Sequence, residues 1–202
     1  MKEDKLIRCP WGGDELMIHY HDEEWGVPVH DDNTHFEFLV LEMFQAGLSW
    51  LTVLRKREAF RKAFANFDPK RVARFNAQDI ARLLNDAGII RNRLKIAAAV
   101  NNAKRFLEVQ QEFGSFDKYI WGFVGGKPVV NKWKTLADIP ASTELSDRVS
   151  ADLKKRGFKF AGSTIVYAHL QATGLVNGHV TSCFRYREVG EGSTKFQLPN
   201  PR

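Results

Sequence analysis

Hydrophobic residues recur at three- and four-residue spacing along most of the chain, which is the pattern of amphipathic helices. Boundary residues support this interpretation: Asp68 and Pro69 are suited to begin a helix, and Gly88 and Gly114 follow the ends of two others. The predicted helices cover residues 34–45, 48–67, 68–75, 76–88, 91–113, 142–157 and 162–174. We therefore expect an all-α fold.

Strand-like alternation is short and confined chiefly to residues 127–133, with no second strand evident as its partner. The sequence contains no internal repeat. Residues 187–202 are polar and lack the helical pattern. We predict a single helical domain over residues 1–186, followed by a C-terminal tail over 187–202.

Composition narrows the class of protein. With 202 residues, of which 44% are hydrophobic, the chain can fill one core or two small lobes. No apolar run is long enough for a membrane helix, and none follows the charged N-terminus as it would in a signal peptide. We expect a cytoplasmic protein without a membrane partner. In that compartment a cysteine near histidines is more often a metal ligand or a buried thiol than half of a disulfide.

The chain is basic, with a net charge of +6 and a pI near 9.4. Most of the excess lies in residues 54–64, 90–95, 118–134 and 153–159. These clusters fit either a polyanionic partner or ordinary solvated helix faces. Charge alone raises the possibility of nucleic-acid binding without deciding it.

The junction NDAGIIRNRLK, residues 85–95, joins two predicted helices. The second helix begins with Arg91, Arg93 and Lys95, and a helix start with basic side chains is suited to bind a phosphate. The alternative is an ordinary helical hairpin in which Ile89 and Ile90 are anchored in the core.

Two aromatic segments surround one carboxylate. Tyr20 and Trp25 lie in YHDEEWGVP, and Glu42 and Trp50 lie in LEMFQAGLSW, with Trp11 just upstream. Each aromatic residue could simply belong to the core. A glycine at position 47 is costly in a helical region, which suggests a turn or a close approach. Glu42, in an apolar stretch, either faces solvent or is held in a pocket for a purpose.

Several long segments together resemble the bacterial 3-methyladenine DNA glycosylase I family. They are YHDEEWGVP, LEMFQAGLSWLTVLRKREAFR, DAGIIRNRLKI and LKKRGFKFAGSTIVYAHLQATGLVNGHV, with the cysteine that follows. The resemblance runs in order from about Cys9 to Cys183 and leaves out the tail after about residue 187.

The resemblance implies one zinc ion held by Cys9, His21, His179 and Cys183. Two thiolates and two imidazoles complete a tetrahedral shell, so such a site is structural, with no open position for water. It would tie the two ends of the chain together. The remaining histidines, His19, His30, His35 and His169, are expected to lie on the surface or to form hydrogen bonds.

The resemblance further implies a helix-hairpin-helix glycosylase fold of two lobes around a base-binding cleft, acting as a monomer on double-stranded DNA that contains alkylated adenine. Such an enzyme flips the damaged nucleotide out of the stack and hydrolyses its N-glycosidic bond. By motif, Gly47 and Leu48 correspond to the wedge that fills the gap, and Glu42 corresponds to the carboxylate facing a cationic purine. The base-binding residues are Trp11, Tyr20, Trp25 and Trp50, and the hairpin contacts to DNA are Gly88, Arg91, Arg93 and Lys95. No lysine is evident as a Schiff-base nucleophile, so no strand cleavage is expected.

Three features depart from the wider pattern. Ile90 stands where the usual hairpin has a second glycine, and no aspartate lies between Asp86 and Asp117 to act as the catalytic group of the wider superfamily. Met17 occupies a position where some relatives have tyrosine. A zinc-stabilised DNA-binding protein without catalysis remains the alternative. Four metal ligands argue against a zinc hydrolase, which needs an open position.

Overall fold

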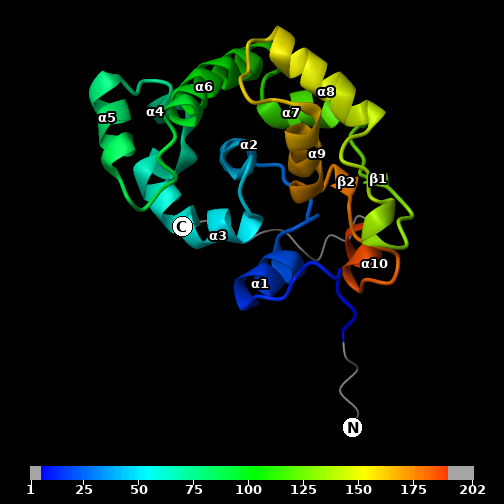
Figure 1. The fold of residues 1–202 in the computed structure, drawn as a ribbon. Helices are drawn as coiled ribbons and strands as arrows, with labels where there is room; N and C mark the ends of the chain where they lie inside the picture. Colours follow the sequence, from blue (N-terminus) through cyan, green and yellow to red (C-terminus); the bar gives the residue numbers. More distant parts are fainter. Residues whose placement is uncertain (1–5, 191–202) are drawn as a thin grey trace.

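The computed structural model describes residues 6–190 and is predominantly helical (Figure 1). The first half contains α1 (Glu15–Glu23), α2 (Asp32–Gln45), α3 (Trp50–Ala63), η1 (Ala65–Phe67), α4 (Pro69–Val72), α5 (Ala77–Asn85) and α6 (Arg93–Phe113). The second half contains α7 (Phe116–Gly122), β1 (Val129–Val130), η2 (Leu136–Asp138), α8 (Glu144–Lys155), α9 (Ser163–Ala172), β2 (Val176–Asn177) and α10 (Arg185–Gly190). Within the described residues, no helix is both long and apolar enough to cross a membrane.

Helix α2 is the central element of the fold. Asp31 caps its N-terminus by accepting a hydrogen bond from the Thr34 amide, and every residue from His35 to Phe44 is buried. A helix that is apolar on nearly all sides must be covered on all sides. Helices α3, α6, α7 and α9 pack against it and share one hydrophobic core with it (Figure 1). The positions of the α2 side chains are therefore fixed by the helices that pack around α2.

The predicted helices are present, with changes at their ends. The segment expected as one helix over 48–67 is broken at Phe64, and Ala65, Asn66 and Phe67 adopt left-handed backbone angles with φ between 53° and 55°. This bend keeps Phe64 and Phe67 stacked in the core, with ring centroids 6.0 Å apart. The periodicity did not predict α1, α7 or α10, which are short helices. Residues 187–190 of the expected tail belong to α10, and residues 191–202 lie outside the described part.

The short strand expected within residues 127–133 has a partner. Strands β1 and β2 pair in parallel, with Val129 opposite Val176 and Val130 opposite Asn177. Two-residue strands carry almost no sequence pattern, which explains why the partner was not found in the sequence. The pair fixes the segment before His179 against the rest of the domain.

The N-terminal segment and the C-terminal helix lie close together at the lower end of the domain (Figure 1). The Phe184 amide donates to the Ile7 carbonyl at 2.9 Å, which directly connects the two ends. This contact brings residues near positions 9 and 183 into one small region.

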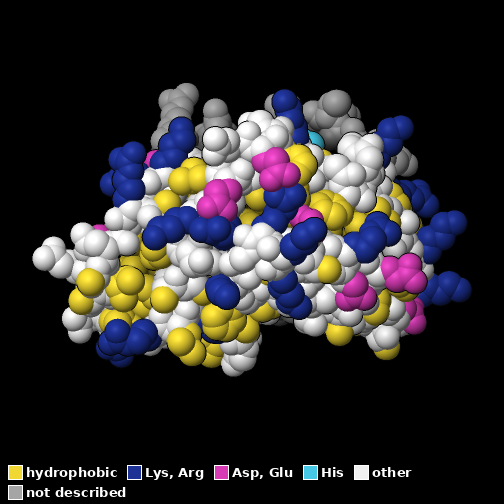
Figure 2. Space-filling model, turned by 90° about the horizontal axis from the view of Figure 1, so that it is seen from above, with side chains coloured by type: hydrophobic (Ala, Val, Ile, Leu, Met, Phe, Trp, Pro, Cys, Tyr) yellow, Lys and Arg dark blue, Asp and Glu magenta, His cyan; other side chains and the backbone are white. Residues whose placement is uncertain are grey.

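The opposite face, over α6 and α8, shows no continuous basic patch. In Figure 2, which views the molecule from above, lysine and arginine side chains are spread out and interspersed with aspartate and glutamate. On this face the charge clusters fit the simpler interpretation of solvated helix surfaces.

Candidate functional site

Four residues from the two ends of the chain converge on one buried point. The ligand atoms of Cys9, His21, His179 and Cys183 all lie within 4.8 Å of one another, and all four residues are buried. Cys9 Sγ and Cys183 Sγ each lie 3.5 Å from His179 Nδ1, and Cys183 Sγ lies 3.4 Å from His21 Nε2. The structure thus brings together the whole set that the sequence suggested.

The outer nitrogens of both histidines are held by other groups. His21 Nδ1 lies 2.7 Å from Asp22 Oδ1, and Arg8 Nη2 in turn donates to Asp22 at 2.7 Å. His179 Nε2 lies 3.1 Å from the Trp25 carbonyl oxygen. A proton on each of these outer nitrogens leaves a lone pair on His179 Nδ1, near both sulfurs, and on His21 Nε2, near Cys183 Sγ and the Cys9 amide. Burial alone would raise the pKa of Asp22, but hydrogen bonds from Arg8 and His21 outweigh burial and lower this pKa below its ordinary value.

The donor set fits a tetrahedral metal ion. Zinc bonds of about 2.3 Å to sulfur and about 2.0 Å to nitrogen give an S···N edge of about 3.5 Å in a tetrahedron. The observed separations of 3.4–3.5 Å match this edge. A hydrogen bond from Cys9 lowers the pKa of the Cys183 thiol despite burial, and His179 and His21 act in the same direction. A thiolate is the form that a metal requires.

Gly26 is required by this arrangement. Its φ is +83°, a conformation that favours glycine, and a β-carbon there would lie 3.0 Å from His179 Nε2. Gly26, Arg8 and Asp22 were not predicted from the sequence as part of the site. The adjacency of Asp22 to His21 was the available signal, since metal-bound histidines commonly donate to a carboxylate.

The predicted base-binding residues form one aromatic cluster beside the Cys9, His21, His179 and Cys183 cluster. Trp11 and Trp25 meet edge to face with centroids 5.0 Å apart, and Tyr20 lies 5.3 Å from Trp50 and 6.5 Å from Phe38. The cluster also includes Met17, Leu54 and Ala172. Met17, noted as a departure from relatives, therefore belongs to the wall of this cluster.

Glu42 is buried in the same region, one helical turn after Phe38 on α2, with 5% of its surface exposed. Burial raises the pKa of its carboxyl group to about 8. Among the described residues, the carboxyl group forms no hydrogen bond and no ion pair. Burial raises the pKa of Tyr20, and the charge of Glu42 adds to that rise, so the two side chains are close enough to interact electrostatically. Of the two alternatives for Glu42, the structure therefore contradicts the solvent-facing side chain.

Trp50 brings a second unsatisfied polar group into the cluster. Its indole Nε1 is buried, and no acceptor for it lies within the described part of the chain. Buried indole N–H groups usually find a partner, so this donor is free for an acceptor on a ligand.

The turn between α2 and α3 presents Leu48 to solvent. Gly47 has φ +82°, and the Leu48 amide donates to the Gln45 carbonyl at 2.6 Å. Leu48 is 44% exposed, and Ser49 caps α3 by accepting from the Thr52 amide. An exposed leucine on a tight turn has the shape that a wedge needs.

The segment predicted as the hairpin consists of α5, a turn over residues 86–92, and α6. Asn92 caps α6, Ile89 is buried, and Arg91 and Arg93 are exposed. The turn therefore anchors an isoleucine in the core, as the simpler alternative requires, and still leaves two arginines available for phosphates. Lys95 differs from the arginines, since it is buried and its ammonium group hydrogen-bonds within the protein.

The remaining histidines divide into two pairs. His19 is exposed, and His30 is exposed with Nδ1 2.8 Å from Asp117, both as expected. His35 and His169 are both buried, contrary to the expectation of surface or hydrogen-bonded residues. Neither ring nitrogen of His169 has a hydrogen-bond partner in residues 6–190. The packing of α2 against α9 buries them, and sequence periodicity gave no indication of this.

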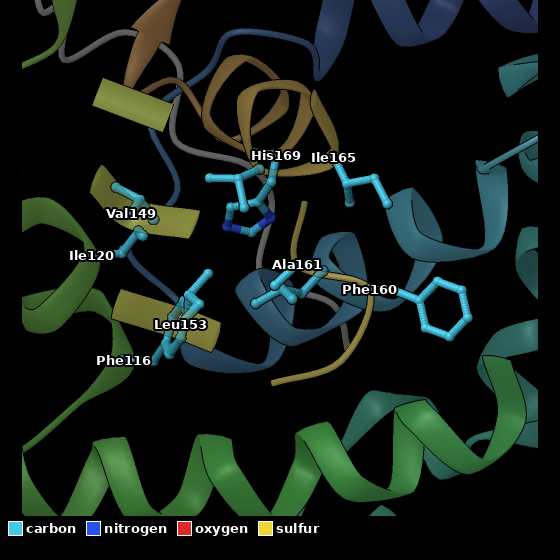
Figure 3. Close-up of a pocket in the computed structure, with 10 residues that line it drawn as sticks. Phe116, Ile120, Val149, Leu153, Phe160, Ala161, Ile165 and His169 are labelled. Carbon is cyan, nitrogen blue, oxygen red and sulfur yellow. The ribbon is translucent and has the colours of Figure 1, made fainter. Parts of the chain in front are cut away.

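The cavity in Figure 3 is separate from the aromatic cluster. It lies between α2, α7, α8 and α9, and the ring of His169 points into it among apolar side chains such as Ile120 and Leu153. None of the predicted site residues lines it. It is a packing defect of the core rather than part of the candidate site.

Comparisons with known proteins agree with this arrangement. The sequence profile of the Methyladenine glycosylase family matches residues 11–186. The chain is 51% identical to DNA-3-methyladenine glycosylase 1 of Escherichia coli K12 over 90% of this chain and 97% of that protein. It is 48% identical to DNA-3-methyladenine glycosylase of Haemophilus influenzae over 87% of this chain and 96% of that protein.

Solved structures give the same result. A crystal structure of 3-methyladenine DNA glycosylase I has a TM-score of 0.85 and 50% identity, covering 88% of this chain and 98% of that one. The Staphylococcus aureus glycosylase, whose structure addresses 3-methyladenine recognition, has a TM-score of 0.85 and 40% identity, covering 88% of this chain and 95% of that one. On the profile match, the sequence identity and the shared structure, the chain belongs to the methyladenine glycosylase family.

Proposed function

We propose that the chain is a DNA repair enzyme that hydrolyses the N-glycosidic bond of 3-methyladenine in alkylated double-stranded DNA. The observation that carries the proposal is the buried Glu42, which has no hydrogen bond or ion pair among the described residues and interacts electrostatically with Tyr20 of the aromatic cluster. Its relatives are named for this activity, and one related glycosylase, 40% identical, has been solved in complex with 3-methyladenine.

The pocket is suited to a cationic purine. Adenine methylated at N3 within DNA carries a positive charge, and the faces of Trp and Tyr rings attract cations. In the empty pocket, burial raises the pKa of Glu42 and favours its neutral form. A bound cation lowers this pKa, so Glu42 becomes ionised and attracts the cation. A neutral purine gains much less from the same groups. Selectivity for the alkylated base follows from this difference.

Bond cleavage is assisted by the same carboxylate. As the glycosidic bond breaks, positive charge develops on the sugar, and a carboxylate fixed in a dry pocket stabilises it. The alkylated base leaves as a neutral molecule, so a strong general acid is not needed. This accounts for the absence of an aspartate between Asp86 and Asp117. Glu42 either activates the attacking water or stabilises charge alone.

Contacts to DNA are assigned to two exposed features. Leu48 on the Gly47 turn fills the space left by the flipped nucleotide, and Arg91 and Arg93 at the start of α6 bind phosphates without reading sequence. Gly88 allows the hairpin turn to pack closely, since a β-carbon there would lie 3.0 Å from that of Ala59. We propose that a monomer engages the duplex through this helix-hairpin-helix element.

The metal centre is proposed to hold one structural zinc ion. Cys9, His21, His179 and Cys183 would be its ligands, and four protein ligands leave no position for a reacting water. When bound, the ion would cross-link the two ends of the chain and would take no part in the reaction. Through Trp25, whose carbonyl contacts His179 and whose ring joins the aromatic cluster, the centre also supports the pocket.

The proposal is tested by measuring release of 3-methyladenine from methylated duplex DNA under single-turnover conditions. We expect base release without strand cleavage, because the aromatic cluster and Glu42 include no lysine in the described part of the chain. Binding of methylated duplex without any base release would favour the alternative, a zinc-stabilised DNA-binding protein without catalysis. Strand cleavage would contradict the monofunctional assignment.

A further inference from the structure

Lys95 occupies an unfavourable position in its own helix. It lies in the first turn of α6, where the helix dipole disfavours a positive charge, and that turn contains no acidic residue to offset it. Its side chain is also buried, unlike those of Arg91 and Arg93 just before it. A buried lysine at a helix N-terminus requires compensation from elsewhere in the fold.

The compensation comes from the end of α2. Lys95 Nζ donates to the Phe44 carbonyl at 3.0 Å and to the Ala46 carbonyl at 2.6 Å. The last turn of α2 has no basic residue of its own, so Lys95 supplies the cation that the negative end of this helix favours. The carbonyl of Ala46 directly precedes Gly47, where the turn carrying Leu48 begins.

A second lysine makes the reverse contact. Lys56 on α3 donates through Nζ to the carbonyls of Ala87 and Gly88, at 3.1 Å each. The turn between α5 and α6 runs beside α3 in Figure 1. Lys95 at the start of α6 therefore binds the C-terminal end of α2, which precedes the Leu48 turn. Lys56 on α3, which follows that turn, binds the turn between α5 and α6.

We propose that Lys95 is a positioning residue that fixes the Leu48 turn relative to the phosphate-binding hairpin, so that the wedge and the phosphate contacts engage the duplex at the same time. The inference rests on the proposed roles of Leu48 and the hairpin arginines. Lys95 is not assigned as a DNA contact, because it is buried and two of its three ammonium donors are directed at protein carbonyls. Lys56 supports the same geometry from the other side.

The test compares Lys95→Met with Lys104→Met. Lys104 is an exposed lysine on the same helix, so its substitution removes the same charge without removing a buried contact. Four quantities are measured: single-turnover excision at saturating methylated duplex, nucleotide flipping from 2-aminopurine fluorescence beside the lesion, affinity for free 3-methyladenine, and the salt dependence of undamaged-duplex binding. We expect Lys95→Met to reduce excision and flipping roughly tenfold or more, because small misplacements of a positioning group are costly. Free-base affinity and the salt slope should stay within about twofold of wild type, as should all four quantities in Lys104→Met.

Excision by Lys95→Met within twofold of wild type would overturn the inference. An equal fall in free-base affinity would also overturn it, since the lysine would then support only the pocket. If Lys95→Met does not fold, the half-buried Lys56→Met is judged by the same criteria, with a smaller expected loss. Leu48→Ala and the double variant Arg91→Ala/Arg93→Ala distinguish a failure of the proposed DNA contacts from a failure of the positioning role of Lys95. If they leave excision unchanged, the proposed DNA contacts and this inference both fail, whereas if they slow excision and the lysine variants do not, only this inference fails.

Discussion

The metal centre and the aromatic pocket are neighbours, yet they differ in how their polar groups are satisfied. Trp11 and Trp25 belong to both, with the Trp25 ring 4.5 Å from that of His179. In the metal centre both outer histidine nitrogens have partners within the protein. In the proposed pocket the buried Trp50 indole nitrogen has no partner among the described residues, and neither has the carboxyl group of Glu42.

This difference is what the proposed roles of a structural site and a binding site require. A site whose own residues satisfy every polar group is rigid and needs only its ion. A pocket that keeps a buried donor and a buried acid unpaired is less stable when empty, and a ligand that pairs with both recovers that free energy. The contrast predicts that substitutions in the metal centre will act on stability and that substitutions in the pocket will act on activity.

The largest effect is expected from disrupting the metal centre. Elemental analysis should find one zinc per chain, and Cys9→Ser should lose it. Structural zinc is worth on the order of 10 kcal/mol in small peptides, and the larger core here reduces the loss. A loss of about 4 kcal/mol would lower Tm by about 8–16 °C in thermal melts. His19→Ala, at an exposed histidine two residues from His21, is the control and should change neither quantity. Metal-free purified protein with an unchanged Tm in Cys9→Ser would contradict the assignment.

The next largest effect is expected from Glu42→Gln in the pocket, which should raise the free energy of unfolding, whereas Cys9→Ser should lower it. The pKa of Glu42 is about 8 in the folded protein, against an ordinary value of 4.5. The unfolded chain therefore loses this proton first, and the free energy of unfolding should fall as pH rises from about 4.5 to about 8. Glu42→Gln removes the titration, so at pH 8 it should be more stable than wild type by a few kcal/mol, with little difference at pH 4.5. Denaturant unfolding at both pH values measures this, and equal stability at pH 8 would show that Glu42 is solvated.

The same substitution should slow catalysis. Glu42→Gln keeps the shape of the side chain and removes its charge, so 3-methyladenine release should fall roughly tenfold or more, equivalent to about 1.4 kcal/mol. Wild-type excision should rise with pH as Glu42 loses its proton, with a midpoint below 8 because the bound cation favours the carboxylate. The variant should lack this rise, while its zinc content and affinity for undamaged duplex remain near wild type. Single-turnover release across pH decides the matter, and a variant as fast as wild type would remove Glu42 from the mechanism.

The smallest effect tests whether an unpaired buried group always indicates a ligand site. His169 is also unpaired within residues 6–190, but it faces an apolar cavity, and burial lowers its pKa well below 6.5. Its contribution to stability is present above pH 6.5 and is lost as pH falls below that value, because the unfolded chain binds the proton first. His169→Phe should reduce the acid loss of stability by about 1 kcal/mol at pH 5.5 without changing excision. The exposed His19→Gln is the control. A loss of base release in His169→Phe would connect this cavity with the active site.

The sequence alone determined the helical class, most helix positions and the candidate residues of both sites. Apolar periodicity is a local property, so the helices at 91–113 and 142–157 were predicted to within about two residues. The ligand set Cys9, His21, His179 and Cys183 came from resemblance to a family, since only the last pair is close in sequence. Helix α1 spans only nine residues, and it was not predicted as a helix.

Only the tertiary structure decided which of these side chains are available and which are used within the fold. Lys95, Arg91 and Arg93 look alike in sequence, but the lysine is directed at the carbonyls of Phe44 and Ala46. Every residue has a backbone carbonyl, so such an acceptor has no signature in the sequence. Burial of Glu42 and of His169 likewise depends on which helices cover α2. Whether each has a partner depends on groups contributed by distant parts of the chain, and these are fixed only when the helices pack.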